Sequence, residues 1–157
     1  GDDWSGCGWG DASTICPWQI YLTYGSKDIL KKQYSSMCKY LKYIALHSKN
    51  RYLWTGCKHF GDWLGLDAPA GSYMGSSDQD FIASVFYSYS TLLVIKAGRA
   101  LGKNVAKYEV LYEKIIRAIR KKYKKYKINK PNQRWLSLRL LEDDATVKNY
   151  ITESVYL

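Results

Sequence analysis

The chain has 157 residues, a formal net charge of +10 and a hydrophobic content of 46%. This length is ordinary for one domain, and the apolar content is sufficient for a globular core. No uninterrupted apolar run appears long enough to cross a bilayer, so we do not expect a membrane protein. The aromatic residues are 15 Tyr and 6 Trp against only 3 Phe. Because Tyr and Trp combine an apolar body with a polar tip, this choice suits surfaces and clefts that are partly wet.

The first third of the chain has the pattern of two helices. Residues 11–24 form the first, with Pro17 in its first turn and Gly25 as its stop. Ser26 is the predicted N-cap of a second helix over residues 27–48. Its apolar stripe has helical spacing and comprises Leu30, Tyr34, Met37, Leu41 and Ile44.

Two further helices follow after residue 76. Residues 77–80, Ser-Asp-Gln-Asp, resemble a capping box with Asp in place of Glu, so Ser77 is the predicted cap. This helix runs to Leu101, and Asn104 is the predicted cap of the next one. The expected stripes are Phe81, Val85, Tyr89, Leu92 and Ile95 in the former, and Tyr108, Leu111, Ile115 and Ile119 in the latter, with Glu109 and Glu113 on its polar side.

The overall pattern is therefore two helical hairpins joined by a long segment at about residues 49–76. No β-hairpin signal interrupts it. A connection of this length without regular structure is uncommon in compact domains and is often functional. Hairpins whose loops gather at one end form a cleft there, and we expect the functional site at that end.

Two short segments combine carboxylates with tryptophan. One is residues 59–69, His-Phe-Gly-Asp-Trp-Leu-Gly-Leu-Asp-Ala-Pro, and the other is residues 2–12, Asp-Asp-Trp-Ser-Gly-Cys-Gly-Trp-Gly-Asp-Ala. Carboxylates hydrogen-bond hydroxyl groups or move protons, and indole rings cover the C–H faces of a sugar. Both segments are thus predicted parts of a sugar-cleaving site. The predicted substrate contacts are Trp9, Trp54, His59, Asp62, Trp63 and Asp67.

Each of these residues also has a plain structural interpretation. Asp11 can cap a helix, and Asp62, between Gly61 and Trp63, can form a turn. A single His without a paired acid is more often structural than catalytic. Trp54 and Trp63 are either sugar platforms or core residues. Asp78 and Asp80 are interpreted as acids at a helix terminus.

The cysteines and the basic residues point to no further chemistry. Cys7, Cys16, Cys38 and Cys57 form no C-x-x-C pair or zinc pattern, so free thiols, no bound metal and a cytoplasmic location are expected. A run of Lys and Arg without an acid extends from Arg117 to Lys130. Such a run can bind nucleic acid, but a solvated helix end is the preferred interpretation because no nucleic-acid motif accompanies it.

Several separated motifs, taken in order, resemble the catalytic domain of α-L-rhamnosidases, glycoside hydrolase family 78. They are Gly8-Trp9-Gly10-Asp11-Ala12, Pro17-Trp18, Tyr24-Gly25, Trp54, Phe60-Gly61-Asp62-Trp63-Leu64 and Asp67-Ala68-Pro69. The resemblance covers roughly residues 4–126. It implies an all-α fold in which helical hairpins form part of an (α/α)6 barrel around a central pocket. It also implies inverting release of terminal α-L-rhamnose.

The resemblance implies roles for individual carboxylates. Asp11 matches an aspartate in the family's sugar pocket, and Asp62 and Trp63 match an element that lines the pocket. The family's general acid is a glutamate shortly before the first motif, where this chain has Asp2-Asp3 and no Glu before Glu109. Asp11 and Asp3 are therefore the candidate catalytic residues. The second catalytic carboxylate of the family lies on a later hairpin, beyond the last residue of this chain.

The sequence thus divides into a partial (α/α)6 domain over residues 1–126 and an unmatched basic tail over 127–157. The tail has a weak helical stripe at Trp135, Leu138 and Leu141. We expect a rhamnosidase-like fragment that acts on a rhamnose-containing glycoside without a cofactor and is weak or inactive alone. The alternative is a non-catalytic carbohydrate-binding or assembly module. Exposed hairpin faces predict a homo-oligomer, and neither nucleic acid nor a membrane is an expected partner.

Overall fold

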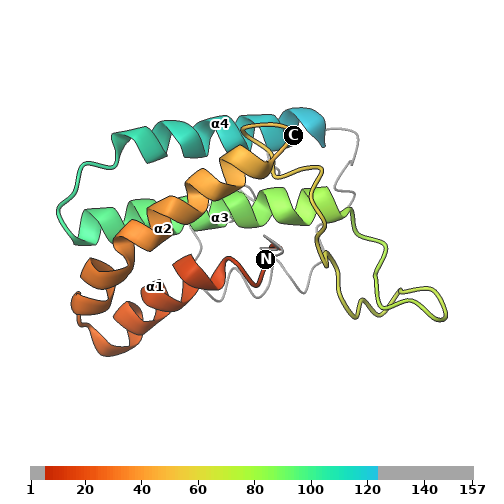
Figure 1. The fold of residues 1–157 in the computed structure, drawn as a ribbon, viewed down its shortest axis with the longest axis horizontal. Helices are drawn as coiled ribbons and strands as arrows, with labels where there is room; N and C mark the ends of the chain where they lie inside the picture. The colour runs from red at the N-terminus through yellow and green to blue at the C-terminus, as the bar shows by residue number, and fades with distance from the viewer. Residues whose placement is uncertain (1–5, 124–157) are drawn as a thin grey trace, which may run out of the picture. The chain divides into compact units, whose positions relative to one another are not determined.

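The protein is described by a computed structural model that covers residues 6–123. It contains four helices, α1 (Ala12–Tyr24), α2 (Asp28–His47), α3 (Gln79–Ala100) and α4 (Ala106–Lys122) (Figure 1). Within these residues there is no strand, only two isolated antiparallel bridges. The predicted all-α class is confirmed. Asp3, the tail from 127 and the last four cations of the basic run lie outside the described residues.

The helices form two antiparallel hairpins, α1–α2 and α3–α4, as predicted. Helix α3 packs against each of the other three. In Figure 1 the α1–α2 and α3–α4 connections lie at one end of the helices, and the long α2–α3 segment emerges at the other. The start of α1 lies at that same end. The topology therefore brings the two carboxylate-tryptophan segments to one end of the hairpins.

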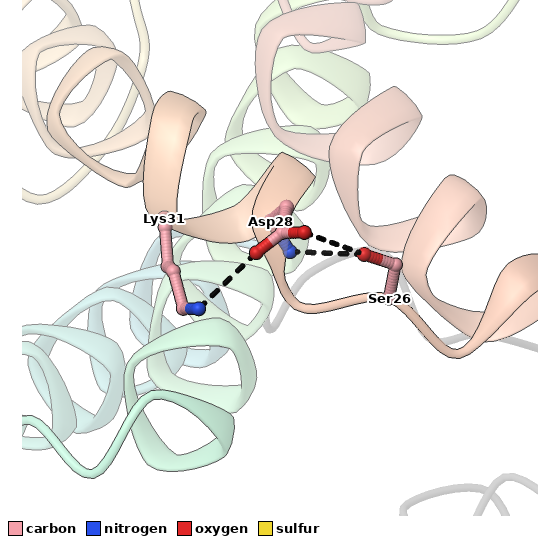
Figure 2. A network of polar contacts seen from close by, with 3 residues as sticks. All are labelled: Ser26, Asp28 and Lys31. Atoms are coloured by element: carbon pink, nitrogen blue, oxygen red, sulfur yellow. Dashed lines mark hydrogen bonds and ion pairs between the residues drawn. The ribbon is translucent and has the colours of Figure 1, made fainter.

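The helix ends follow local chemistry, with shifts of one residue from the predictions. Gly25 ends α1 with φ of 70°, and its N–H donates to the Tyr21 carbonyl. Before α2, the Ser26 hydroxyl accepts the Asp28 N–H at 3.2 Å (Figure 2). Asn104 does the same for Ala106 before α4, at 3.0 Å. Both side chains satisfy a free N–H of the first turn from one residue before the cap position.

Two predicted helix starts are wrong in detail. Pro17 is buried inside α1 and not in its first turn. The N-cap of α3 is Asp78 and not Ser77, since the Asp78 carboxylate accepts the Phe81 N–H at 2.8 Å. Ser77 instead donates its hydroxyl to Asp62 at 2.9 Å. The serine therefore fixes the preceding loop, while the aspartate caps the helix.

Helix α3 is the core of the two hairpins. Its buried residues occupy most of its circumference and include Ala83, Tyr87, Val94 and Ala97, whereas Val85 of the predicted stripe is 36% exposed. The helix is long and apolar enough to cross a membrane by length and composition, contrary to our expectation, but 61% of that apolar window is buried inside the protein. Its composition is thus explained by burial from several sides.

Helices α2 and α4 are amphipathic, as predicted. Leu30, Met37, Leu41 and Ile44 of α2 are at most 2% exposed, and Ile115 of α4 is fully buried. The helices approach closely at Gly98 of α3, where a Cβ would lie 2.4 Å from the Val105 side chain and 2.5 Å from the Tyr34 hydroxyl oxygen. Glycine there lets α3 and the start of α4 pack tightly.

Candidate functional site

The structure brings the two predicted segments into contact at one end of the helices. The Cys7 N–H donates to Nδ1 of His59 at 3.3 Å, in the protein interior. The ring centroids of Trp9 and Phe60 lie 6.3 Å apart. Residues 6–11 and 59–63 are thus neighbours, although about fifty residues separate them in sequence.

Four aromatic side chains continue from this contact along the loop. Trp9 meets Phe60, Phe60 meets Trp63 edge-on with centroids 4.9 Å apart, and Trp63 stacks on Tyr73 at 5.7 Å. Trp9, Trp63 and Tyr73 are 79%, 49% and 65% exposed. We call Trp9, Phe60, Trp63 and Tyr73 the aromatic row. Exposed rings in a row offer apolar faces to which the C–H face of a sugar can bind.

Tyr73 is a member of the row that sequence reasoning missed. It is brought to Trp63 because residues 62–65 and 73–75 pair across the loop. Leu64 N–H donates to the Tyr73 carbonyl at 2.6 Å, and Gly75 N–H donates to the Asp62 carbonyl at 2.8 Å. The only sequence signal was a Tyr among small residues, which by itself does not indicate which segment it pairs with.

Asp62 and Asp67 both brace this loop. The Asp62 carboxylate accepts the Ser77 hydroxyl, and Asp67 accepts both the N–H and the hydroxyl of Ser76. The hydrogen bonds from Ser76 lower the pKa of Asp67 below its ordinary value. Asp67 is exposed and therefore stays ionised near neutral pH, as a carboxylate that accepts hydrogen bonds from sugar hydroxyls would need to be.

Gly75 controls the shape of the loop. A Cβ there would lie 2.5 Å from Oδ2 of Asp62 and 2.9 Å from Oδ1 of Asp67. We expect Gly75→Ala to separate residues 62–67 from 73–77, because neither carboxylate can keep its serine partner. Near-ultraviolet circular dichroism of the tryptophans measures the change, with Ala68→Ser as the control in the same loop. An unchanged aromatic spectrum in Gly75→Ala would contradict the predicted constraint.

Asp11 lies beneath the start of α1 and is fully buried. Its carboxylate accepts the Gly8 N–H at 2.9 Å and the Ser90 hydroxyl at 2.5 Å, and the Ser90 hydroxyl also bonds that of Thr14 at 2.7 Å. Burial raises the pKa of Asp11, although the hydrogen bonds from Ser90, Gly8 and Tyr40 oppose the shift. The side chain makes no capping bond to α1. Instead it fixes the Gly8–Trp9 turn to α3.

His59 and Trp54 are buried side by side, 5% and 1% exposed. Their rings meet edge-on at 4.8 Å, and Trp54 also packs against Tyr40 at 6.0 Å. Nδ1 of His59 accepts the Cys7 N–H, so the neutral ring carries its proton on Nε2. Burial lowers the pKa of His59, with Asp80 opposing the shift. This arrangement matches the structural interpretation of His59 as a neutral acceptor that holds Cys7.

The cysteines and the acids at the start of α3 add no further chemistry to the site. All four cysteines are free thiols, as expected. Among residues 6–123 no group of three His, Cys, Asp or Glu side chains is placed to hold a metal ion. Asp78 and Asp80 both lie at the start of α3, and Asp80 also accepts the Gly56 N–H.

Comparison with known proteins identifies the kind of domain. Residues 3–146 match the family described as the bacterial alpha-L-rhamnosidase 6 hairpin glycosidase domain. The chain belongs to this family. It therefore corresponds to part of a helical-hairpin glycoside hydrolase domain, of which the described residues supply two hairpins. The match extends past residue 126, where the motif resemblance ends.

Individual alpha-L-rhamnosidases are also similar to this chain in sequence. The chain is 33% identical over 126 residues to an alpha-L-rhamnosidase of Alteromonas sp. (strain LOR), covering 77% of this chain and 14% of the relative. It is 34% identical over 113 residues to one from Formosa agariphila, covering 71% and 12%. The chain thus spans only about an eighth of the length of these relatives.

A solved structure supports the fold. The crystal structure of Streptomyces avermitilis alpha-L-rhamnosidase complexed with L-rhamnose superimposes with a TM-score of 0.65 at 29% identity. The match covers 74% of this chain and 10% of that one. The prediction that these hairpins are part of an α/α barrel is thereby confirmed.

Proposed function

We propose that this chain contributes the aromatic row and the Asp62–Asp67 loop to the rhamnose site of an inverting α-L-rhamnosidase. The observation that carries the proposal is the row itself, since three exposed rings lie beside two carboxylates within a domain of the rhamnosidase family. The relative from Streptomyces was solved with L-rhamnose, the sugar proposed as ligand here.

The proposed roles of the carboxylates follow from their surroundings. Inversion requires a protonated and an ionised carboxyl about 6.5–9.5 Å apart. Asp67, with its lowered pKa, fits the ionised partner or a hydroxyl acceptor. Asp11 has a raised pKa, but it is fully buried and both its oxygens are bonded, so it positions Trp9 and does not reach the sugar directly. Asp3 remains the proposed general acid.

The buried pair Trp54 and His59 acts on the sugar site through neighbours. His59 holds Cys7, two residues before Trp9, and Trp54 packs against His59. Trp9, Asp62, Trp63 and Asp67 are then the proposed direct contacts. With a single accessible carboxylate of lowered pKa in the described site, the chain alone is proposed to hydrolyse aryl α-L-rhamnosides weakly or not at all.

Two assays test this assignment together. We expect L-rhamnose to change the tryptophan fluorescence of the chain, because a sugar stacked on the row alters the surroundings of Trp9 and Trp63. Trp63→Ala should abolish the change. Trp18→Phe should retain it, because Trp18 lies on α1 and packs against Tyr21, outside the row. A response that persists in Trp63→Ala, or none in the unmodified chain, would disprove the site.

Release of nitrophenol from an aryl α-L-rhamnoside separates the two candidate functions. A sugar response without turnover favours the alternative, a non-catalytic carbohydrate-binding module, for which the exposed row is also suited. Exposed apolar side chains on α1, Ile20, Leu22 and Tyr24, support assembly into a homo-oligomer in either case.

A further inference from the structure

A cavity lies away from the aromatic row. It opens between α2 and the start of α4, has a volume of about 580 Å³, and is lined in part by Lys31, Tyr34, Lys103, Lys107 and Tyr108. We call it the lysine groove. These residues belong to the end of the helices where α1–α2 and α3–α4 connect, opposite the α2–α3 segment (Figure 1). The groove is therefore separate from the candidate sugar site.

The groove is positively charged. Three lysines line it, and none of its lining residues is acidic. The Lys103 ammonium lies over the Tyr34 ring, 5.5 Å from its centroid, and that of Lys107 lies 4.8 Å from the centroid of Tyr108. Cation–π contacts of this kind hold an ammonium group over one face of a ring. Two of the three charges thus have defined positions in the groove walls.

The helix dipole does not explain these cations, although Lys31 is paired with Asp28. Lys31 and Lys107 lie in the first turns of α2 and α4, where the helix dipole is positive and favours acids. The acids in those turns, Asp28 and Glu109, are already paired with Lys31 and Arg99. The positive ends of two helices therefore add to the charge of the lysines at one cavity. Such a combination attracts anions.

We propose that the lysine groove binds a small phosphate-bearing ligand in the size range of a sugar phosphate. Lysine ammonium groups are strong donors to phosphate oxygens and adapt to them on flexible stems. The rings of Tyr34 and Tyr108 form the walls of the groove and hold the Lys103 and Lys107 ammonium groups in place. The volume lies within the range of small-molecule sites, which argues for a compact ligand over a polymer.

The Asp28 carboxylate already accepts a hydrogen bond from Lys31, so it competes with a bound phosphate for this lysine (Figure 2). Asp28 accepts a hydrogen bond from Lys31 at 3.1 Å and a weaker one from the Ser26 hydroxyl at 3.4 Å. A bound phosphate must share Lys31 with this carboxylate. Removal of the Asp28 charge is therefore expected to free Lys31 for the ligand and to strengthen binding.

The test is isothermal titration of the whole chain with inorganic phosphate and with glucose 6-phosphate. The double variant Lys103→Gln/Lys107→Gln is expected to weaken binding of either ligand about tenfold or more. The control Lys39→Gln/Lys42→Gln removes the same charge from an exposed part of α2 outside the groove and is expected to weaken it less than about twofold. Asp28→Asn should bind more tightly than the unmodified chain.

Each result decides the proposal. Tighter binding of glucose 6-phosphate than of phosphate supports a phosphorylated sugar, and equal binding supports recognition of the phosphate group alone. Equal weakening in the two double variants would show general attraction by net charge and overturn the site. No binding of either ligand by the unmodified chain overturns it as well. Circular dichroism verifies that the variants, all at exposed positions, keep their helices.

Discussion

Replacement of Asp11 by Ala is expected to lower the free energy of unfolding by about 3 kcal/mol. The Asp11 carboxylate is fully buried and joins the turn before α1 to the middle of α3. Without it, the partly buried Gly8 N–H loses its acceptor, and the buried Ser90 hydroxyl keeps only its bond to Thr14. Urea unfolding followed by circular dichroism at 222 nm, the usual helix wavelength, measures the loss. A deficit below about 0.5 kcal/mol would contradict this role, since that is the range of surface substitutions.

The matched variant Asp11→Asn tests the charge separately from the shape. Its amide oxygen can accept the Gly8 N–H, and its amide N–H can donate to Ser90, whose hydroxyl then donates to Thr14. Burial raises the pKa of Asp11 above its ordinary 3.8, so the folded protein holds the proton more tightly than the unfolded chain. This contribution to stability is present below pH 3.8 and is lost as the pH rises through the folded pKa. The Asn side chain does not ionise, so the stability of Asp11→Asn does not fall over this pH range for this reason.

The comparison of pH profiles is therefore diagnostic. The deficit of Asp11→Asn relative to the unmodified chain should shrink as the pH rises from about 3.8 towards neutrality. Parallel profiles for the two proteins would show that Asp11 ionises in the fold as easily as it does in the unfolded chain.

The helices that sequence predicts well are those with one buried face. Leu30, Met37, Leu41 and Ile44 follow helical spacing and are buried on one side of α2. The same reasoning fails for helix α3, because helices α1, α2 and α4 all pack against it and cover it on several sides. Its buried set includes Ser84, Ser88 and Thr91, whose hydroxyls bond backbone carbonyls of their own helix. Polar residues satisfied in this way enter a core without any stripe that a sequence pattern could show.

In the candidate site, too, the sequence predicts what depends on local motifs and misses what depends on residues far away in the chain. The motifs identified the Trp9 and Trp63 segments, which the structure brings into contact. The predicted place was wrong, because these segments lie at the end opposite the α1–α2 and α3–α4 loops and not where the hairpin loops gather. The motifs did not predict that Asp11 is buried, because its partner Ser90 is 79 residues away. Tyr73 was missed for a similar reason, since its place in the row depends on pairing across the loop. Long-range partners decide whether a polar residue faces a ligand or the core, and a single sequence does not specify them.

Trp54→Ala is expected to destabilise the protein by about 4 kcal/mol, because it removes a large side chain that is 1% exposed. The indole lies between Tyr40 and His59, and its loss leaves a cavity next to the ring that holds Cys7. Trp54→Phe fills most of this space and should cost roughly half as much. Thermal and urea unfolding of the two variants measure the difference.

The same pair of variants decides between the two interpretations of Trp54. If Trp54 supports the site from the core, Trp54→Phe keeps the rhamnose-dependent fluorescence change of Trp9 and Trp63, because His59 still accepts the Cys7 N–H. Trp54→Ala loses stability and the sugar response together, since the Cys7–Trp9 turn is no longer held. A Trp54→Phe variant of unchanged stability that fails to respond to rhamnose would instead make Trp54 a direct sugar contact. The fold would then have to open around residue 54 when the sugar binds.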